Sequence, residues 1–565
     1  MHQQHYTDTD TLYQIQQHIT LGVNLDLITQ PVDIKYNNTY SVSQHLETVR
    51  SRLIEYIAFG AVIQLPDTVQ PKIVQPLHVI IKKNKKPRLV IDLSRNLNDH
   101  LPSVPFSYST VESAVKQSYQ YCWYAKLDLS NCFLSFPLHP SVLKYFIFQL
   151  DQHYYQFIRM PFGLKPAPLV CTQLLSVIAF ALQQQSIVIV RYLDDFLIIG
   201  QSFNQVQQQL ATAINIFQQF GLVVNPEKTE GPVQIITFLG IQLDSINCTL
   251  SCTIDRIVEL KHIIQSIINP NTGLISQHHS LRCRSILSLL GKFSFAAQVL
   301  PGARPFMRRM IDLTRHKAYS TRIRISTAFC LDLQYWYNHL NIWNGRQLWR
   351  YSQPFTIVSD ASLQGFGFYL ESIPSQIQLN LPTELQVGSS FLGHWSECHA
   401  EFHATHRGIS WCELFSVFAA VHIYAPYLEN QSIILVVDNQ TDVHIINRQS
   451  TSSTRLAILL RALYDVAINH NIRLTAVHRP GEQNILADFL SRPALHCNQP
   501  LQCWNQHLTA TASTVGIDTN QFPSLSHVSQ IYSGQFQIQE LNNSLIQTIQ
   551  NSVPLSIYLP QWPLE

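Results

Sequence analysis

Charged side chains are scarce in this sequence. Only 13% of its residues are Asp, Glu, Lys or Arg, whereas hydrophobic residues make up 46%. Chains that stay disordered because of their charge have the opposite composition, so we expect packed domains. A length of 565 residues is too great for one core, and at roughly 150 residues per domain we expect three or four units.

The sequence also lacks the features of secreted and membrane proteins. Its N-terminus, MHQQHYTDTD, has no basic stretch followed by an apolar one. The longest uncharged apolar stretches, Leu174–Leu182 and Leu414–Leu428, are shorter than the ~20 residues that span a bilayer. The 11 cysteines form no paired pattern, which indicates a reducing compartment. We therefore expect an intracellular protein of the cytoplasm or nucleus, neither secreted nor membrane-bound.

Basic residues are missing from the end of the chain, since no Lys or Arg follows Arg492. The formal net charge of +2 is too small to indicate a nucleic-acid partner by itself. The basic residues are nevertheless clustered, between Lys82 and Arg88 and again between Arg304 and Arg324. Such clusters suit a phosphate backbone, although most basic runs are simply solvated faces.

Periodicity and composition divide the chain into five segments. Residues 1–44 are polar, and we expect an irregular N-terminal extension there. Residues 45–245 mix helices with strands, and residues 246–350 are mostly helical. Residues 351–492 alternate strands with helices, as in an α/β unit. Residues 493–565 form a tail rich in Gln and Asn, without clear periodicity and with no function that the sequence indicates.

Two adjacent carboxylates, Asp194 and Asp195, stand between apolar runs in RYLDDFLIIG, which predicts a tight hairpin. In apolar surroundings the two carboxylates are tolerable mainly when cations neutralise them, although a solvated Asp-Asp turn is the alternative. Asp128 ends an earlier apolar strand and could complete a site for two divalent ions about 4 Å apart. Mg²⁺ suits such a site because it prefers carboxylates, water and phosphates.

Five segments resemble, in order and spacing, the polymerase motifs of retroelement reverse transcriptases: LDLSNCF, MPFGLKPAP, YLDDFLIIG, GLVVNPEKT and FLGIQL. KPRLVIDLSRNLN resembles the upstream fingers segment of that family, and the resemblance covers about residues 45–245. It implies an α+β right-hand polymerase of fingers, palm and thumb, followed by a helical connection. It also implies RNA-directed DNA synthesis from an RNA template, a DNA or RNA primer and deoxynucleoside triphosphates. Two Mg²⁺ ions would serve each active site, with Mn²⁺ as an alternative.

The resemblance assigns roles to individual residues. The metal-binding catalytic residues are Asp128, Asp194 and Asp195. Phe133 matches the aromatic residue that excludes a 2′-hydroxyl, with a core Phe as the alternative. Further nucleotide-binding roles fall on Arg88 for the triphosphate, Gly163 for close backbone approach and Lys228 near the pyrophosphate, with Lys82 or Lys83 assisting. The family pattern is broken at Phe162, where many retroviral enzymes have Gln, and after Asp92, so no role passes to Phe162 or Arg95.

A second set of motifs follows the order of ribonuclease H over about residues 353–492: SDAS, GFG, CEL, VVDNQT and HRPGEQNILADFLSR. It implies an α/β ribonuclease H-like domain that hydrolyses the RNA strand of an RNA–DNA hybrid. The metal-binding catalytic carboxylates would be Asp360, Glu413, Asp438 and Asp488. His478 matches the mobile histidine of that enzyme. Taken singly, each acidic residue could equally cap a turn or lie on a solvated face.

The segments LLGKFSFAAQVLPGARPFMRRMIDL, LDLQYWYNHL and DNQTDVHIIN most resemble the DIRS/Ngaro group of retrotransposons, which encode a tyrosine recombinase. Gypsy-type and hepadnavirus-like polymerases are more distant alternatives. The sequence contains no protease-like Asp-Thr/Ser-Gly, zinc knuckle, recombinase or integrase motif. We therefore expect a separately encoded recombinase to be the partner for integration. The oligomeric state is not indicated.

Several His and Cys residues precede Glu413: His394, Cys398, His399, His403, His406 and Cys412. His399 and His403 are four residues apart and could bind zinc on one helix face. The other spacings are irregular, so a solvated or packed cluster is the more common outcome.

Two other functions compete with an active reverse transcriptase. A catalytically inactive, retroelement-derived nucleic-acid-binding protein is opposed by the presence of all seven carboxylates. An RNA-dependent RNA polymerase is opposed by Phe133 and by the ribonuclease H motifs.

Overall fold

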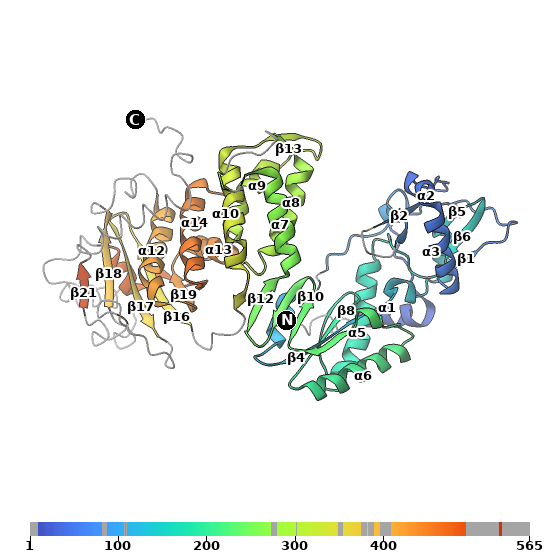
Figure 1. Cartoon of the computed structure of the whole chain (residues 1–565), viewed down its shortest axis with the longest axis horizontal. Coiled ribbons are helices and arrows are strands. Elements are labelled where there is room, and N and C mark those ends of the chain that lie inside the picture. The colour runs from blue at the N-terminus through green and yellow to red at the C-terminus, as the bar shows by residue number, and fades with distance from the viewer. Residues whose placement is uncertain are drawn as a thin grey trace. The chain divides into compact units, whose positions relative to one another are not determined.

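The computed structural model describes residues 9–81, 87–106, 108, 110–269, 271–272, 280–300, 302–347, 354–373, 381, 389–395, 408–492 and 530–533. The chain forms two compact units, residues 1–248 and residues 249–565, and Figure 1 shows their elements. Both units mix helices with sheets, as expected from the sequence. The five predicted segment boundaries stay predictions.

The first unit is built around a four-stranded sheet in the order β7-β8-β4-β9. Its strands are β4 (Trp123–Asp128), β7 (Val188–Tyr192), β8 (Asp195–Gly200) and β9 (Glu230–Val233). Helices α5 (Ala167–Gln184) and α6 (Phe203–Gln219) pack on it and contribute apolar side chains to a large core. A short hairpin, β10 (Ile235–Phe238) with β11 (Ile241–Asp244), follows.

A second group of elements in this unit precedes the sheet in sequence. Helix α3 (Leu46–Ala58) packs on β1 (Val62–Gln64), which pairs with β6 (His153–Phe157), and β6 pairs with β5 (Ile147–Leu150). The hairpin of β2 (Leu77–Ile80) and β3 (Arg88–Ile91) carries Arg88 at the start of β3. The remaining short elements are α4 (Val111–Gln117) and the 3-10 turns Leu97–His100, Cys132–Ser135, Pro140–Tyr145 and Pro226–Lys228.

The expectation of an irregular segment over residues 1–44 is wrong. Residues Thr9–Leu21 form helix α1 and Tyr40–Gln44 form helix α2. Ile15, Val23 and Val42 are buried in the core, and Val23 pairs with Leu138 in a parallel bridge. The local sequence is polar because only a few side chains reach that core, and their partners lie far along the chain.

The second unit begins with β12 (Thr249–Cys252), which pairs with β15 (Arg346–Gln347), and a helical segment between them. Its helices are α7 (Ile254–Ile267), α8 (Cys283–Ala296), α9 (Arg308–Thr314) and α10 (Thr327–Trp343). The 3-10 turn Arg304–Met307 precedes α9. The antiparallel pair of β13 (Ser280–Arg282) and β14 (Arg322–Arg324) joins two parts of the segment.

A six-stranded sheet in the order β20-β19-β16-β17-β18-β21 follows. Its strands are β16 (Phe355–Ala361), β17 (Gly365–Ser372), β18 (Ser389–His394), β19 (Ser432–Val437), β20 (Arg473–His478) and β21 (Gln530–Ser533). β19 runs parallel to β16 and β20, whereas β17 is antiparallel to β16 and β18. The helices are α12 (Ile409–Tyr424), α13 (Gln440–Arg448), α14 (Thr454–Asn469) and α15 (Ile485–Leu490).

A buried ion-pair network joins the helical segment to α14 within this unit. Asp332 on α10 is 3% exposed and accepts hydrogen bonds from Arg309 at 3.0 Å and from Arg461 at 3.0 and 3.1 Å. Arg461 on α14 also donates to the Pro305 carbonyl oxygen at 3.2 Å. The helical segment and the six-stranded sheet with its helices therefore share an interior.

Two helices, Ala167–Gln184 and the stretch Ile409–Tyr427, are long and apolar enough to cross a membrane by length and composition. They exceed the apolar stretches counted in the sequence, because a few polar residues interrupt each helix. Both contribute to cores in this structure: α5 packs with β7 and α6, and α12 packs on β16 and β17.

Candidate active sites

Three carboxylates of the first unit meet at one end of the β7-β8-β4-β9 sheet. In the antiparallel pair of β4 and β8, Asp128 lies directly opposite Asp195. Asp195 also pairs with Tyr192, so Leu193 and Asp194 form the tip of the β7–β8 hairpin, with Leu193 at a left-handed φ of 51°. The Leu129 amide donates to the Asp194 carbonyl oxygen at 3.1 Å, which holds the hairpin tip against the end of β4.

The electrostatics of this group favour a bound cation. Burial raises the pKa of Asp195 to about 6, and repulsion from Asp194 and Asp128 adds to the shift. Burial also raises the pKa of Asp194, with repulsion from Asp128 adding to it. Partly buried carboxylates that repel one another are stabilised by nearby positive charge. The structure supplies one such charge, because Lys228 Nζ lies 2.7 and 2.9 Å from the two oxygens of Asp128.

The donor set fits Mg²⁺, which prefers carboxylate oxygens and substrate phosphates. Asp128, Asp194 and Asp195 are the side chains that would hold it. Across the described part of the chain, however, no three or more His, Cys, Asp or Glu side chains are arranged to hold a metal ion. Lys228 occupies both oxygens of Asp128, so a cation at Asp128 would compete with this lysine.

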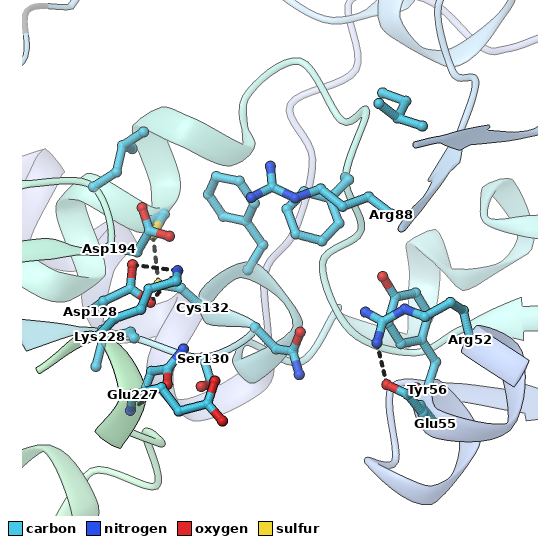
Figure 2. Close-up of a pocket in the computed structure, with 18 of the residues that line it drawn as sticks. Arg52, Glu55, Tyr56, Arg88, Asp128, Ser130, Cys132, Asp194, Glu227 and Lys228 are labelled. Carbon is cyan, nitrogen blue, oxygen red and sulfur yellow. Dashed lines mark hydrogen bonds and ion pairs between the residues drawn. The ribbon is translucent and has the colours of Figure 1, made fainter. Parts of the chain in front are cut away.

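A cavity of about 720 Å³ opens beside the carboxylates (Figure 2). Asp128, Asp194 and Lys228 line one side of it, and Arg88 reaches in from β3. The Arg88 guanidinium lies 5.3 Å from the centre of the Phe162 ring, and Phe162 meets Phe133 edge-on at 5.5 Å. The predicted nucleotide-binding residues Arg88, Phe133 and Lys228 therefore line one cavity, whereas Lys82 and Lys83 lie outside the described residues.

The backbone of Gly163 lies close to a neighbouring strand, a role for this glycine that the motif does not indicate. Its φ is +106°, and a Cβ added there would lie 2.3 Å from the carbonyl oxygen of Ile91. Only glycine permits this approach. The close neighbour is thus strand β3, which carries Arg88, and the predicted approach of a nucleotide or template to Gly163 stays a prediction.

The second set of predicted residues gathers in the second unit. Asp360 lies on β16, Glu413 on α12 and Asp488 on α15, and Asp438 directly follows β19. Burial raises the pKa of Asp360 to about 7, and repulsion from the other three carboxylates adds to this shift. Burial also raises the pKa of Asp438, and that of Glu413 to about 6. This arrangement too suits divalent cations, since four carboxylates repel one another there.

Neighbouring side chains already contact these acids. Asn439 donates a hydrogen bond to Glu413, and Arg492 pairs with Asp488. His478 ends β20, and its Nε2 lies 3.0 Å from the carbonyl oxygen of Asp438. The resemblance to ribonuclease H implies a histidine beside the last carboxylate, Asp488; the contact that the structure shows is with Asp438.

Asp442 is an acidic residue near this site that the sequence analysis missed. It lies on the buried face of α13, is 0% exposed, and both its carboxylate oxygens lack a hydrogen-bond partner among the described residues. Burial raises its pKa to about 8, with repulsion from Glu413 and Asp438 adding to the shift. The motif VVDNQT points only to Asp438, so no sequence signal marked Asp442.

The stability of the second unit should therefore depend on pH through Asp442. A carboxyl group whose folded pKa lies above its unfolded pKa loses stability as pH rises through that interval. Urea unfolding with EDTA at pH 5 and at pH 8 tests this. Between these pH values the free energy of unfolding of wild type should fall by about 2 to 4 kcal/mol more than that of Asp442→Asn. A constant difference between the two proteins at both pH values would contradict the buried, ionisable assignment.

The His and Cys cluster before Glu413 lies mostly outside the described residues. Cys412 is described, is buried, and burial raises the pKa of its thiol to about 12. A thiol that stays protonated is a poor zinc ligand. The predicted zinc site at Cys398, His399, His403 and His406 falls on residues that the structure does not describe, and His394 is described only as the end of β18.

Comparison with known proteins gives the following similarities. Residues 71–243 match the family model of reverse transcriptase (RNA-dependent DNA polymerase). An enzymatic polyprotein of Cassava vein mosaic virus is 22% identical over 452 residues, which are 79% of this chain and 65% of the relative. The retrovirus-related Pol polyprotein from transposon 412 of Drosophila melanogaster is 23% identical over 440 residues, 75% of this chain and 32% of the relative. The chain thus spans about two thirds and one third of the lengths of these two relatives.

Among solved structures, the foamy viral protease-reverse transcriptase in complex with dsDNA has a TM-score of 0.48 and 17% identity. The similarity covers 81% of this chain and 88% of that one. The same viral protein in complex with an RNA/DNA hybrid has a TM-score of 0.49 and 16% identity, covering 80% of this chain and 56% of that one.

Proposed function

We propose that this chain, which contains a reverse transcriptase domain over residues 71–243, is the RNA-directed DNA polymerase of a retroelement. The observation that carries the proposal is the meeting of Asp128, Asp194 and Asp195 at one sheet end, beside a cavity that Arg88 also lines. In the reaction, the primer 3′-hydroxyl attacks the α-phosphate of a deoxynucleoside triphosphate, and pyrophosphate leaves. This chemistry needs positioning and charge neutralisation rather than a covalent nucleophile.

The chain's own residues divide this work. Asp128, Asp194 and Asp195 would hold two Mg²⁺ ions, with Mn²⁺ as an alternative. Bound there, such ions would supply the positive charge that acidifies the 3′-hydroxyl and neutralises the leaving pyrophosphate. Arg88 binds the triphosphate through its planar guanidinium. Lys228 leaves Asp128 for the pyrophosphate when substrate is bound. Phe133 closes the cavity against a 2′-hydroxyl, supported by its edge-on contact with Phe162.

We further propose that residues 351–492 form a ribonuclease H domain that degrades the RNA strand of the RNA–DNA hybrid. Asp360, Glu413, Asp438 and Asp488 would hold its two metal ions, and His478 would assist next to Asp438. The proposal is supported by the four neighbouring carboxylates, on a strand, a loop and two helices. Burial raises the pKa of three of them, Asp360, Glu413 and Asp438. Both activities in one chain suit each other, because copying RNA leaves a hybrid whose template strand must be removed.

The resemblance to the DIRS/Ngaro group supports a separately encoded recombinase as the integration partner. The substrates we propose are an RNA template, a DNA or RNA primer and the hybrid. A reducing compartment of the cytoplasm or nucleus is supported by the burial of all eight described cysteines.

Primer extension on an RNA template, with the full chain, Mg²⁺ and either deoxy- or ribonucleotides, tests the polymerase proposal. Wild type should make template-length DNA and discriminate against ribonucleotides. Phe133→Val should keep the rate of DNA synthesis within several-fold of wild type. It should lower the discrimination against ribonucleotides by about 10- to 100-fold, because the smaller side chain removes a clash that costs a 2′-hydroxyl about 1–3 kcal/mol.

A labelled RNA strand in the hybrid product reports ribonuclease H activity in the same tubes. Wild type that binds the hybrid but neither extends the primer nor cuts RNA would favour the catalytically inactive nucleic-acid-binding protein. Unchanged discrimination in Phe133→Val would make Phe133 a core residue only.

A further inference from the structure

Helix α3 carries two arginines with different surroundings. Arg50 is on the outer face, where Asp151 accepts from its Nε and Nη2 at 2.8 and 3.1 Å and Glu47 accepts from Nη1 at 2.7 Å. Arg52 is only 8% exposed and lines the 720 Å³ cavity. Each arginine has a glutamate three residues away on the helix, so the two differ mainly in what they face.

The hydrogen-bonding capacity of Arg52 is only partly used. Glu55 accepts from its Nη1, whereas its Nε is buried and has no hydrogen-bond partner among the described residues. The guanidinium lies 5.0 Å from the centre of the Tyr56 ring, and the Tyr56 hydroxyl is likewise buried without a partner in that part of the chain. A buried donor left unpaired costs about 1–3 kcal/mol, so two on one helix face point to a missing acceptor.

The position of Arg52 indicates what that acceptor is. Figure 2 shows Arg52, Glu55 and Tyr56 on the side of the cavity away from Asp128, Asp194 and Lys228, with Arg88 reaching in between. Ile80, at the end of β2 and 37% exposed, lines the same cavity. A cavity lined by a guanidinium with an unpaired donor and by an exposed apolar side chain suits a nucleic-acid strand, whose phosphates and bases alternate.

We propose that Arg52 binds a phosphate group of the substrate at the end of the cavity away from the carboxylates. The phosphate belongs either to the single-stranded template ahead of the primer or to the incoming triphosphate. Glu55 holds the guanidinium in place while the site is empty and gives way to the phosphate, which offers more acceptor oxygens for a bidentate contact. This inference rests on the proposed polymerase function and adds a substrate contact on α3, outside the predicted site residues.

Two measurements on the full chain distinguish the two sources of phosphate. The first is the dissociation constant for a template–primer with a single-stranded 5′ template extension, compared with a blunt duplex, by fluorescence anisotropy without nucleotide. The second is the KM for deoxynucleotide in single-nucleotide incorporation. Arg52→Gln should raise either the dissociation constant or the KM about tenfold, as expected for a lost charge-assisted contact of about 1.4 kcal/mol. Arg50→Gln is the matched control and should change both by less than twofold.

A weaker dissociation constant confined to the extended template assigns the phosphate to the template strand, and a higher KM alone assigns it to the triphosphate. Changes below twofold in both, in a folded Arg52→Gln protein, would overturn the proposal. If Arg52→Gln does not fold, Glu55→Gln takes its place. Removing the competing carboxylate should tighten the affected measurement several-fold, and no change would overturn the proposal.

The binding measurement needs no catalysis, so its outcome is separate from that of the polymerase proposal. If wild type binds the template–primer in an Arg52-dependent way but does not extend the primer, the polymerase assignment is refuted and the phosphate contact of Arg52 is retained.

Discussion

Asp194→Asn is expected to lower primer extension by about 10³-fold or more, because the charge stabilisation that bound metal supplies is worth several kcal/mol. Asp194 lies at the tip of the β7–β8 hairpin, where burial, with added repulsion from Asp128, already raises its pKa. The amide keeps the shape of the side chain and removes the charge that a divalent cation needs. The loss should therefore appear in kcat, whereas binding of the hybrid should change by less than twofold.

The measurement is single-turnover extension on an RNA template, with hybrid binding followed separately by fluorescence anisotropy. Asp151→Asn is the matched control, since Asp151 is an exposed carboxylate of the same unit whose positive φ of 50° asparagine adopts readily. Its surface ion pair with Arg50 contributes little. Extension by Asp194→Asn at more than a tenth of the wild-type rate would refute the metal-ligand role of Asp194.

Asp332→Ala should destabilise the second unit by about 3–5 kcal/mol, because it leaves the buried guanidinium of Arg461 and the partly buried one of Arg309 without their carboxylate. Asp332 is 3% exposed and accepts from both Arg309 and Arg461. Burial lowers the pKa of Arg309 to about 10, which shows how strongly this interior disfavours an uncompensated charge.

Urea unfolding of the full chain would measure this effect in the transition that belongs to the second unit. A chain of two units need not unfold in one step, so the transition midpoint is compared at a constant slope. Asp312→Asn is the control, because Asp312 makes an exposed pair with Arg308 in the same helical segment. We expect a change below about 0.5 kcal/mol there. Equal shifts in the two variants would show that the Asp332 network adds no more than a surface pair.

Much of the polymerase site could be predicted from the sequence because its signals are local. The apolar runs around Asp194 and Asp195 specify two strands, and two strands so close in sequence must form a hairpin. The pairing of Asp128 with Asp195 is not local, yet the motif order supplied it through the family resemblance. The same holds for Asp360 and Asp438, which sit at the ends of neighbouring parallel strands.

Features that depend on distant partners could not be predicted. Arg461 and Asp332 are 129 residues apart, and nothing in either segment indicates the other. The sequence around Arg52 is that of any exposed helix, and only the fold shows that its side chain faces the cavity. Asp442 differs from an exposed acid solely by lying on the inner face of α13. The N-terminal residues looked irregular because α1 and α2 each bury one described hydrophobic side chain, Ile15 and Val42, and one such residue per helix gives no periodic signal.

The parallel bridge between Val23 and Leu138 has a consequence for how the protein is made. A ribosome releases Val23 roughly a hundred residues before Leu138, which at about 5–20 residues per second is a delay on the order of ten seconds. During that time Ile15 and Val23 have no core to enter. We therefore expect this stretch of the nascent chain to be the first that a chaperone binds. The core of the first unit is complete only after Leu138, the partner of Val23, has been synthesised.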